Sequence, residues 1–154
     1  MGAVVFLLTG LFIAAADQLS KLWIRTALPE GHVFFRLGFF QIMHIQNTGA
    51  AFGLFRDKTF ILTIIAAVAI VALLIYGLVV HRRFPFFDGL LSRLSLGLVM
   101  GGTAGNLIDR IRLGYVTDFI DFIYWPAFNV ADAAITTGVI LLAYSLLRPS
   151  RAKE

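Results

Sequence analysis

The sequence contains no cysteine and few charged residues. Without cysteine, disulfide bonds, thiol catalysis and Cys-ligated zinc are excluded. Charged residues make up 14% of the 154 residues and hydrophobic residues 59%, whereas a typical soluble domain carries about 25% charged residues. So few charges cannot cover the surface of a water-soluble globule, and lipid must therefore cover part of it. The composition excludes a soluble enzyme, a DNA-binding domain and a disordered tail, and it indicates an integral membrane protein.

Four long hydrophobic runs are present. A helix needs roughly 20 apolar residues to cross a hydrocarbon core of about 30 Å, and each run provides them. The sequence therefore predicts a mainly α-helical membrane protein, a single domain over residues 1–154. Its four transmembrane helices are expected at about 3–24, 60–80, 90–111 and 128–147. The expected connections are two outer loops, 25–59 and 113–127, and a cytoplasmic turn at 81–89.

The first outer loop contains a segment rich in Phe and Ile, from Val33 to Gln46, with Gly38 in its middle. Aromatic and β-branched residues on both sides of a turn residue are typical of a β-hairpin. This segment predicts two short strands that form a small extramembrane β-sheet.

The distribution of Lys and Arg predicts the orientation of the chain. Basic residues concentrate in short cytoplasmic segments of membrane proteins. The densest groups here lie around the short turn and at the C-terminus: Arg82, Arg83 and Arg93, then Arg148, Arg151 and Lys153. We therefore expect both termini and the turn in the cytoplasm. This topology also accounts for the net charge of +4 without a nucleic-acid partner.

Polar residues within and beside the hydrophobic runs gather near one leaflet in this topology. An ionisable side chain in a membrane helix costs about 2.5–3.5 kcal/mol, so it usually faces protein or water. The residues concerned are Asp17, Lys21, Asn106, Asp109, Arg110, Asp118, Asp121, Asn129 and Asp132. Asp17 and Lys21 share a helix face because they lie four residues apart. That pair fits either a structural role or a role in a site. The same holds for the neighbours Asp109 and Arg110, whose adjacency suggests that they pair with each other.

Asp118 and Asp132 are the two aspartates for which the sequence offers the fewest basic partners. Only Arg112 lies near Asp118 in the sequence, and Asp132 is the single charge of the fourth run. If the outer loop folds back, the two carboxylates meet at the membrane surface and share one proton, because two close carboxylates cannot both ionise. One would then activate water and the other would protonate the departing amine. This is the chemistry of an aspartic protease, which needs no metal and no cofactor.

Five short motifs along the chain resemble those of the bacterial lipoprotein signal peptidases, also called signal peptidase II. They are DQLSK at 17–21, NTGAAF at 47–52, GGTAGNLIDR at 101–110, VTDFID at 116–121 and FNVAD at 128–132. The resemblance spans residues 17–132, in a chain of about the family's length with the same number of predicted helices.

The resemblance implies a membrane-embedded aspartic endopeptidase, in which the small sheet of the first outer loop would form a cradle for the substrate. Such an enzyme removes signal peptides from prolipoproteins and cuts on the N-terminal side of a cysteine that carries a diacylglyceryl group. The implied roles are catalysis for Asp118 and Asp132, contacts to the substrate or the peptide antibiotic globomycin for Asn47, Asn106, Arg110 and Asn129, and supporting roles for Asp17, Lys21 and Asp109. We also expect a monomer in the bacterial inner membrane, in contact with membrane lipids, with its site near the outer leaflet.

Two other classes of function are weighed against this one. A small transporter or channel could relay protons or bind cations through Asp17, Asp109, Asp118 and Asp132. Such a path needs polar groups through the whole membrane, however, and the run at 60–80 has no charge. A non-enzymatic scaffold could be held together by Gly97, Gly101 and Gly105, which recur every four residues. A scaffold gives no reason for aspartates and asparagines to gather near one leaflet.

Overall fold

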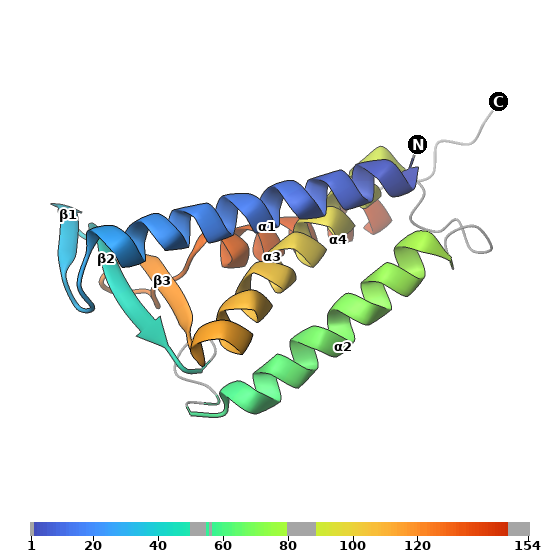
Figure 1. Ribbon diagram of the computed structural model, residues 1–154. Helices are drawn as coiled ribbons and strands as arrows, with labels where there is room; N and C mark the ends of the chain where they lie inside the picture. The colour runs from blue at the N-terminus through green and yellow to red at the C-terminus, as the bar shows by residue number, and fades with distance from the viewer. Residues whose placement is uncertain (1, 50–54, 56, 80–88, 148–154) are drawn as a thin grey trace.

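Four helices and three strands make up the described part of the chain. The computed structural model describes residues 2–49, 55, 57–79 and 89–147. In chain order the elements are α1 (Gly2–Ala27), β1 (Val33–Leu37), β2 (Phe40–Asn47), α2 (Thr59–Leu78), α3 (Leu90–Leu113), β3 (Val116–Asp121) and α4 (Val130–Leu147). Figure 1 shows the helices as a bundle with the strands at the end opposite the start of α1. The predicted mainly helical fold with a small sheet is confirmed.

The helices carry apolar side chains on their outside and polar ones inside. Large apolar residues such as Phe12, Phe60 and Ile140 are 71%, 76% and 62% exposed. Asp17 and Lys21 are 0% exposed. This arrangement is the reverse of a water-soluble fold and suits a surrounding hydrocarbon phase. By length and composition, three of the described helices can cross a membrane: α1, α2 and α4.

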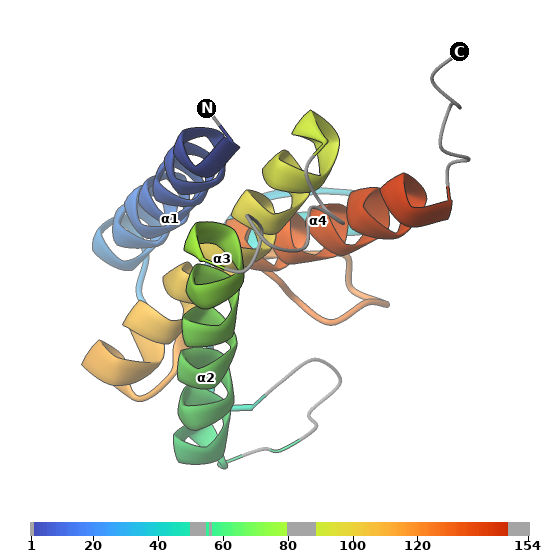
Figure 2. The ribbon, with the colours of Figure 1, turned by 90° about the vertical axis from the view of Figure 1, so that its right-hand side faces the viewer.

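α3 differs from the other helices because protein covers it. It packs against α1, α2 and α4, and Figure 2 shows α1 and α4 on either side of it, with α2 in front. Gly97 and Gly101 lie so close to the backbone of α1 that a Cβ would collide with it, and Gly102 lies equally close to Ala131 of α4. Small residues allow such close helix contacts. Length and composition therefore support three of the four predicted membrane spans. The fourth, α3, is a helix of 24 residues with a polar, glycine-rich surface.

The sheet has three strands rather than the two expected from the first outer loop. β1 and β2 form the predicted hairpin, and β3 pairs antiparallel with β2 in the order β1-β2-β3. The prediction of an outer loop at 113–127 missed β3, because Val116 to Phe119 are all buried and show no polar–apolar alternation. The hairpin and the second outer connection thus form one sheet.

Several element boundaries differ slightly from the predicted ones. α4 begins at Val130, two residues later than expected, and α3 continues to Leu113, where Gly114 adopts a left-handed conformation with φ of 80°. α2 ends at Leu78. Residues 81–88 of the predicted cytoplasmic turn and the basic C-terminal residues lie outside the described residues, as do residues 50–52 of the NTGAAF motif.

Candidate active site

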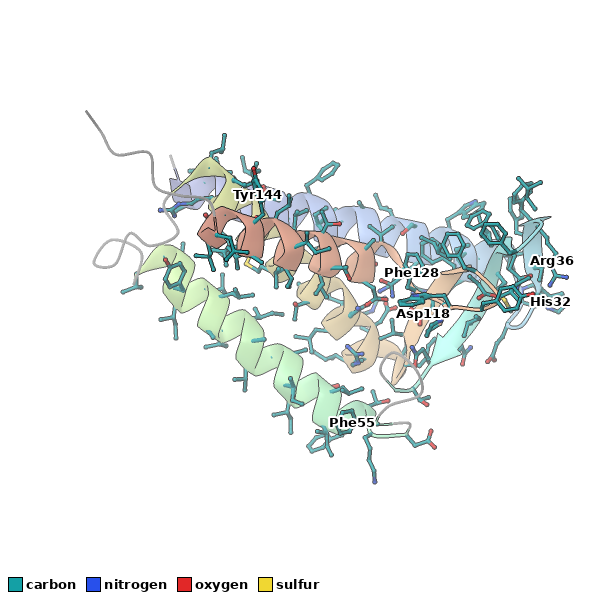
Figure 3. All side chains as sticks on the ribbon, turned by 180° about the vertical axis from the view of Figure 1, so that it is seen from behind. His32, Arg36, Phe55, Asp118, Phe128 and Tyr144 are labelled. Carbon is teal, nitrogen blue, oxygen red and sulfur yellow. The ribbon has the colours of Figure 1, made fainter. Side chains whose placement is uncertain are left out.

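A cavity of about 560 Å³ lies where the sheet meets the helix ends. Its walls come from the end of β2, the last turns of α3, β3, and the beginning of α4. Five of the predicted site residues line it: Asn47, Asn106, Arg110, Asp118 and Asp132. Figure 3 shows Asp118 beside Phe128 at this junction, while Tyr144 lies toward the other end of the bundle.

Asp118 is placed by strand pairing on both sides of β3. It lies opposite Ile45 of β2. On the other side, Ile120 and Phe128 exchange two backbone hydrogen bonds of 2.9 Å, so the chain after β3 turns back toward the start of α4. The side chain of Asp118 is 2% exposed. The loop after β3 folds back, as expected if the two carboxylates are to meet, and Asp118 and Asp132 line one cavity.

Asp132 is placed by the first turn of α4. Asn129 is the residue before this helix, and its Oδ1 accepts a hydrogen bond from the backbone N–H of Asp132 at 3.0 Å. In return, Oδ2 of Asp132 accepts from the backbone N–H of Asn129 at 3.3 Å. This reciprocal pair is a capping box, which satisfies helix N–H groups that otherwise lack partners. Helix capping therefore holds the Asp132 carboxylate in a defined position.

Asparagine amides donate to both carboxylates. Asn47 Nδ2 donates to Oδ2 of Asp118 at 2.8 Å, and Asn129 Nδ2 donates to Oδ1 of Asp118 at 2.7 Å. Asn106 Nδ2 donates to Oδ1 of Asp132 at 2.8 Å. Asn129 also donates to Oδ1 of Asn106 at 3.1 Å, which links the surroundings of the two carboxylates. Uncharged donors orient the carboxylates without neutralising them.

The two carboxylates also influence each other electrostatically. Burial, reinforced by the negative charge of Asp132, raises the pKa of Asp118 to about 7, although hydrogen bonds from Asn47 and Asn129 act in the opposite direction. A buried carboxyl group with a pKa near neutrality can hold a proton at physiological pH and release it. That property is the one required of a general acid.

A buried charge network lies next to this pair, between α1 and α3. Nζ of Lys21 lies 2.8 Å from Oδ2 of Asp17 and 3.4 Å from Oδ2 of Asp109. Nη1 of Arg25 lies 3.3 Å from Oδ1 of Asp109. Oδ1 of Asp17 also accepts a hydrogen bond of 3.0 Å from the backbone N–H of Ala131, in the first turn of α4. Two cations thus balance two carboxylates, and the network joins three helices.

Asp109 and Asn129 have other contacts than the sequence suggested. Asp109 pairs with Lys21 and Arg25, whereas Arg110 lines the cavity and lies 3.5 Å from the carbonyl oxygen of Gly49. Consecutive helix residues point in different directions, so a pair between Asp109 and Arg110 is the wrong interpretation. Asn129 is 0% exposed, does not line the cavity and contacts both aspartates. The expected contact of Asn129 with substrate therefore differs from its position in this structure.

Sequence reasoning missed three residues of the network. Arg25 was assigned to the loop, yet it lies in α1 and donates to Thr117 Oγ1 at 3.0 Å as well as to Asp109. The backbone N–H of Thr117 donates to Oδ2 of Asp109 at 3.0 Å, and Gln18 donates to Oδ1 of Asp109 at 3.1 Å. The i,i+4 spacing of Lys21 and Arg25 could have revealed Arg25. No sequence signal marks Thr117, because its contact with Asp109 uses the backbone and its contact with Arg25 joins segments far apart in the chain.

The two carboxyl groups of this cavity can carry out acid–base chemistry. Among the described residues, no group of three or more His, Asp or Glu side chains is arranged to hold a metal ion. One partly exposed carboxylate and one buried carboxyl group line the same cavity. Such a pair can deprotonate a water molecule and protonate the group that this water attacks.

Comparisons with known proteins point to a single family. A family model described as "Signal peptidase (SPase) II" matches residues 9–148. A protein of Moorella thermoacetica named lipoprotein signal peptidase is 47% identical over 146 residues, covering 94% of each chain. One of Dehalococcoides mccartyi with the same name is 41% identical and covers 96% of this chain and 92% of its own. A solved structure described as a bacterial membrane enzyme superposes with a TM-score of 0.81 at 32% identity, covering 97% of this chain and 91% of that one.

Proposed function

This chain belongs to the signal peptidase II family and removes signal peptides from prolipoproteins, and we propose that Asp118 and Asp132 are its catalytic pair. The observation that carries this assignment is their shared setting. Both carboxylates line one cavity, and hydrogen-bonded asparagines join them. The raised pKa of Asp118, about 7, supports the division of roles between them.

In the proposed mechanism Asp118 carries the proton and Asp132 is ionised. Asp132 takes a proton from a water molecule, whose oxygen attacks the carbonyl carbon of the scissile peptide bond. Asp118 gives its proton to the carbonyl oxygen, which forms a tetrahedral diol. Asp132 then passes its proton to the amide nitrogen, and Asp118 recovers one from the diol as the C–N bond breaks. The products are a carboxylic acid and the free amine of the residue that follows.

The substrate contacts in this proposal come from the polar lining of the cavity. Asn47, Asn106 and Arg110 line the cavity and can hydrogen-bond an extended peptide backbone. Asn129 orients Asp118 and Asp132 from behind. Asp17, Lys21 and Asp109 support this arrangement through the buried charge network. The proposal also states that the enzyme cuts on the N-terminal side of a diacylglyceryl cysteine and that globomycin competes for the same cavity.

The proposed setting is the inner membrane, with the cavity near the outer leaflet and both termini in the cytoplasm. The cavity is lined by residues of β2 and β3, and these strands lie at one end of the bundle (Figure 1). A lipidated substrate would present its scissile bond at that depth. We assign α3 a transmembrane position as well, because α1, α2 and α4 cover its polar surface. The two carboxylates and the asparagines that contact them belong to the same chain, so this pair needs no second copy, in keeping with the proposed monomer. The comparisons give no support to a transporter.

Cleavage of a defined substrate tests the proposal. A diacylglyceryl-modified prolipoprotein and its unlipidated form are incubated in detergent with the wild-type protein, with and without globomycin, and processing is followed by gel shift. We expect cleavage of the lipidated form alone, suppressed by globomycin. Equal cleavage of both forms would remove the lipid requirement. No cleavage by a folded protein would overturn the proposal and direct attention to ion flux in liposomes.

A further inference from the structure

Three asparagine amides direct their NH₂ groups toward the two carboxylates: those of Asn47, Asn129 and Asn106. An amide can rotate by 180° and present its oxygen instead, since its two ends have the same shape. An ionised carboxylate rejects the rotated amide, but a protonated carboxyl group can donate to it. The proposed reaction protonates each of the two carboxylates in turn. Asp118 and Asp132 therefore cannot by themselves keep these amides in one orientation.

Each of the three amide oxygens accepts a hydrogen bond from a group that can only donate. Oδ1 of Asn47 accepts from the backbone N–H of Gly49 at 2.9 Å, and Oδ1 of Asn129 accepts from the backbone N–H of Asp132 at 3.0 Å. Oδ1 of Asn106 accepts from Nζ of Lys21 at 2.8 Å. An ammonium group has three donors and no acceptor. Two of the three orienting donors therefore belong to the backbone, and the third is a side chain.

We propose that Lys21 is a positioning residue, which keeps the Asn106 amide turned with its NH₂ toward Asp132 in every protonation state of the catalytic pair. Asn129 also approaches Oδ1 of Asn106, but at 3.1 Å, and its two amide protons are divided among Asn106, Asp118 and the carbonyl oxygen of Thr117. Lys21 is the donor at the shorter distance, and its three N–H groups match its three acceptors, Asn106, Asp17 and Asp109, in number. The inference rests on the proposed catalytic roles of Asp118 and Asp132.

The burial of Lys21 supports this role. Its side chain is 0% exposed, and removing an ammonium group from water is costly even when it is paired. Asp17 and Asp109 neutralise its charge, yet well-packed apolar residues can join helices at least as well as a buried ion pair. Helix cohesion alone leaves the hydrogen bond from Lys21 to Asn106 unexplained. That bond gives the Asn106 amide a preferred orientation, because it holds Oδ1 against a group that can only donate.

The test removes the ammonium group without leaving an unpaired buried carboxylate. Asp17→Asn is the reference, because the asparagine oxygen can still accept the N–H of Ala131. Adding Lys21→Met should lower kcat about tenfold to a hundredfold with little change in KM, as expected when a catalytic group loses its geometry. Lys58→Met, at an exposed lysine outside the cavity, is the matched control and should keep wild-type kcat. Unchanged kcat in a folded Lys21→Met variant would overturn the inference.

A second background separates positioning from general stabilisation. If Lys21 acts through Asn106, then Lys21→Met should cost little further kcat once Asn106→Ala is present, because residues that act through one another are not additive. An equal loss with and without Asn106 would overturn the inference. If the methionine variant does not fold, Lys21→Arg, which keeps a cation that only donates, should turn over faster than Lys21→Gln. Equal turnover of these two variants would also overturn it.

Failure of this inference is distinguishable from failure of the proposed function. Asp118→Asn and Asp132→Asn are assayed on the same lipidated substrate. Turnover by either of them would overturn the catalytic pair itself. Two inactive aspartate variants together with a fully active Lys21→Met variant would leave the pair intact and remove only the role of Lys21.

Discussion

Asn129 donates a hydrogen bond from Nδ2 to Oδ1 of Asp118 at 2.7 Å, and so joins the beginning of α4 to the middle of β3. The same side chain caps α4 by accepting the backbone N–H of Asp132. One residue thus begins a helix and connects the two proposed catalytic carboxylates. The start of α4 and the geometry of the site are therefore coupled through a single side chain.

Substitution of Asn129 should separate these two tasks. Asn129→Ser keeps an oxygen that can cap the helix but loses the amide, so the unfolding temperature should stay near that of the wild type while kcat falls. Asn129→Ala loses both the capping oxygen and the amide. It should lower the free energy of unfolding by about 0.5–2 kcal/mol, the usual cost of a lost N-cap. Thermal unfolding in detergent and the cleavage rate report the two effects. A serine variant with wild-type kcat would contradict the bridging role.

The catalytic pair itself is tested by two isosteric substitutions. Asp118→Asn and Asp132→Asn keep the size and one oxygen of each side chain but cannot exchange the proton. We expect folded proteins without detectable cleavage of the lipidated prolipoprotein, and unfolding temperatures serve as the control for folding. Retained turnover in either purified variant would show that the wrong pair has been assigned.

The sequence was sufficient to predict the helices and the end of the bundle where the polar residues gather. Runs of about 20 apolar residues are a strong signal. Spacings of four residues placed Asp17 and Lys21 on one helix face, and the structure shows them paired. Motif order then placed Asp118 and Asp132 together in one family site. These predictions depend on local patterns, which a single sequence contains.

Other features depend on contacts between distant segments and could not be predicted. β3 is buried along most of its length, so it lacks the alternation that reveals a strand, and its partner β2 lies some 70 residues earlier. Asp109 was given the wrong partner because adjacency in sequence suggested Arg110, whereas Arg25 approaches it from another helix. The orientation of an asparagine amide is likewise set by its three-dimensional surroundings.

Asp109 should contribute mainly to stability. It is 1% exposed and accepts from Lys21, Arg25 and the backbone N–H of Thr117. Asp109→Asn leaves the buried Lys21 and the partly buried Arg25 with one carboxylate, and breaking a buried ion pair costs about 3–5 kcal/mol. We expect a clear drop in unfolding temperature with residual cleavage at low temperature. An inactive variant of wild-type stability would instead indicate a direct role in the reaction.

Activity should depend on pH through Asp118. Because burial and the charge of Asp132 raise the pKa of Asp118 to about 7, this carboxyl group is protonated below that pH and ionised above it. The proposed mechanism needs the protonated form, so kcat/KM should fall as pH rises through about 7, approaching tenfold per unit. Cleavage rates at subsaturating substrate between pH 5 and about 9 measure this. A kcat/KM that rises across the same range would make Asp118 the base.

Asn47 provides an independent control on that assignment, because it contacts Asp118 at Oδ2. Its hydrogen bond favours the ionised carboxylate and lowers the pKa of Asp118 against the larger effect of burial. Asn47→Ala removes this donor, so the alkaline limb of the kcat/KM profile should move to higher pH, whatever the variant does to the absolute rate. A loss of substrate contacts alone would lower kcat/KM equally at all pH values. A movement of the limb to lower pH would mean that another group controls the profile, and Asp118 would then lose its role as the acid.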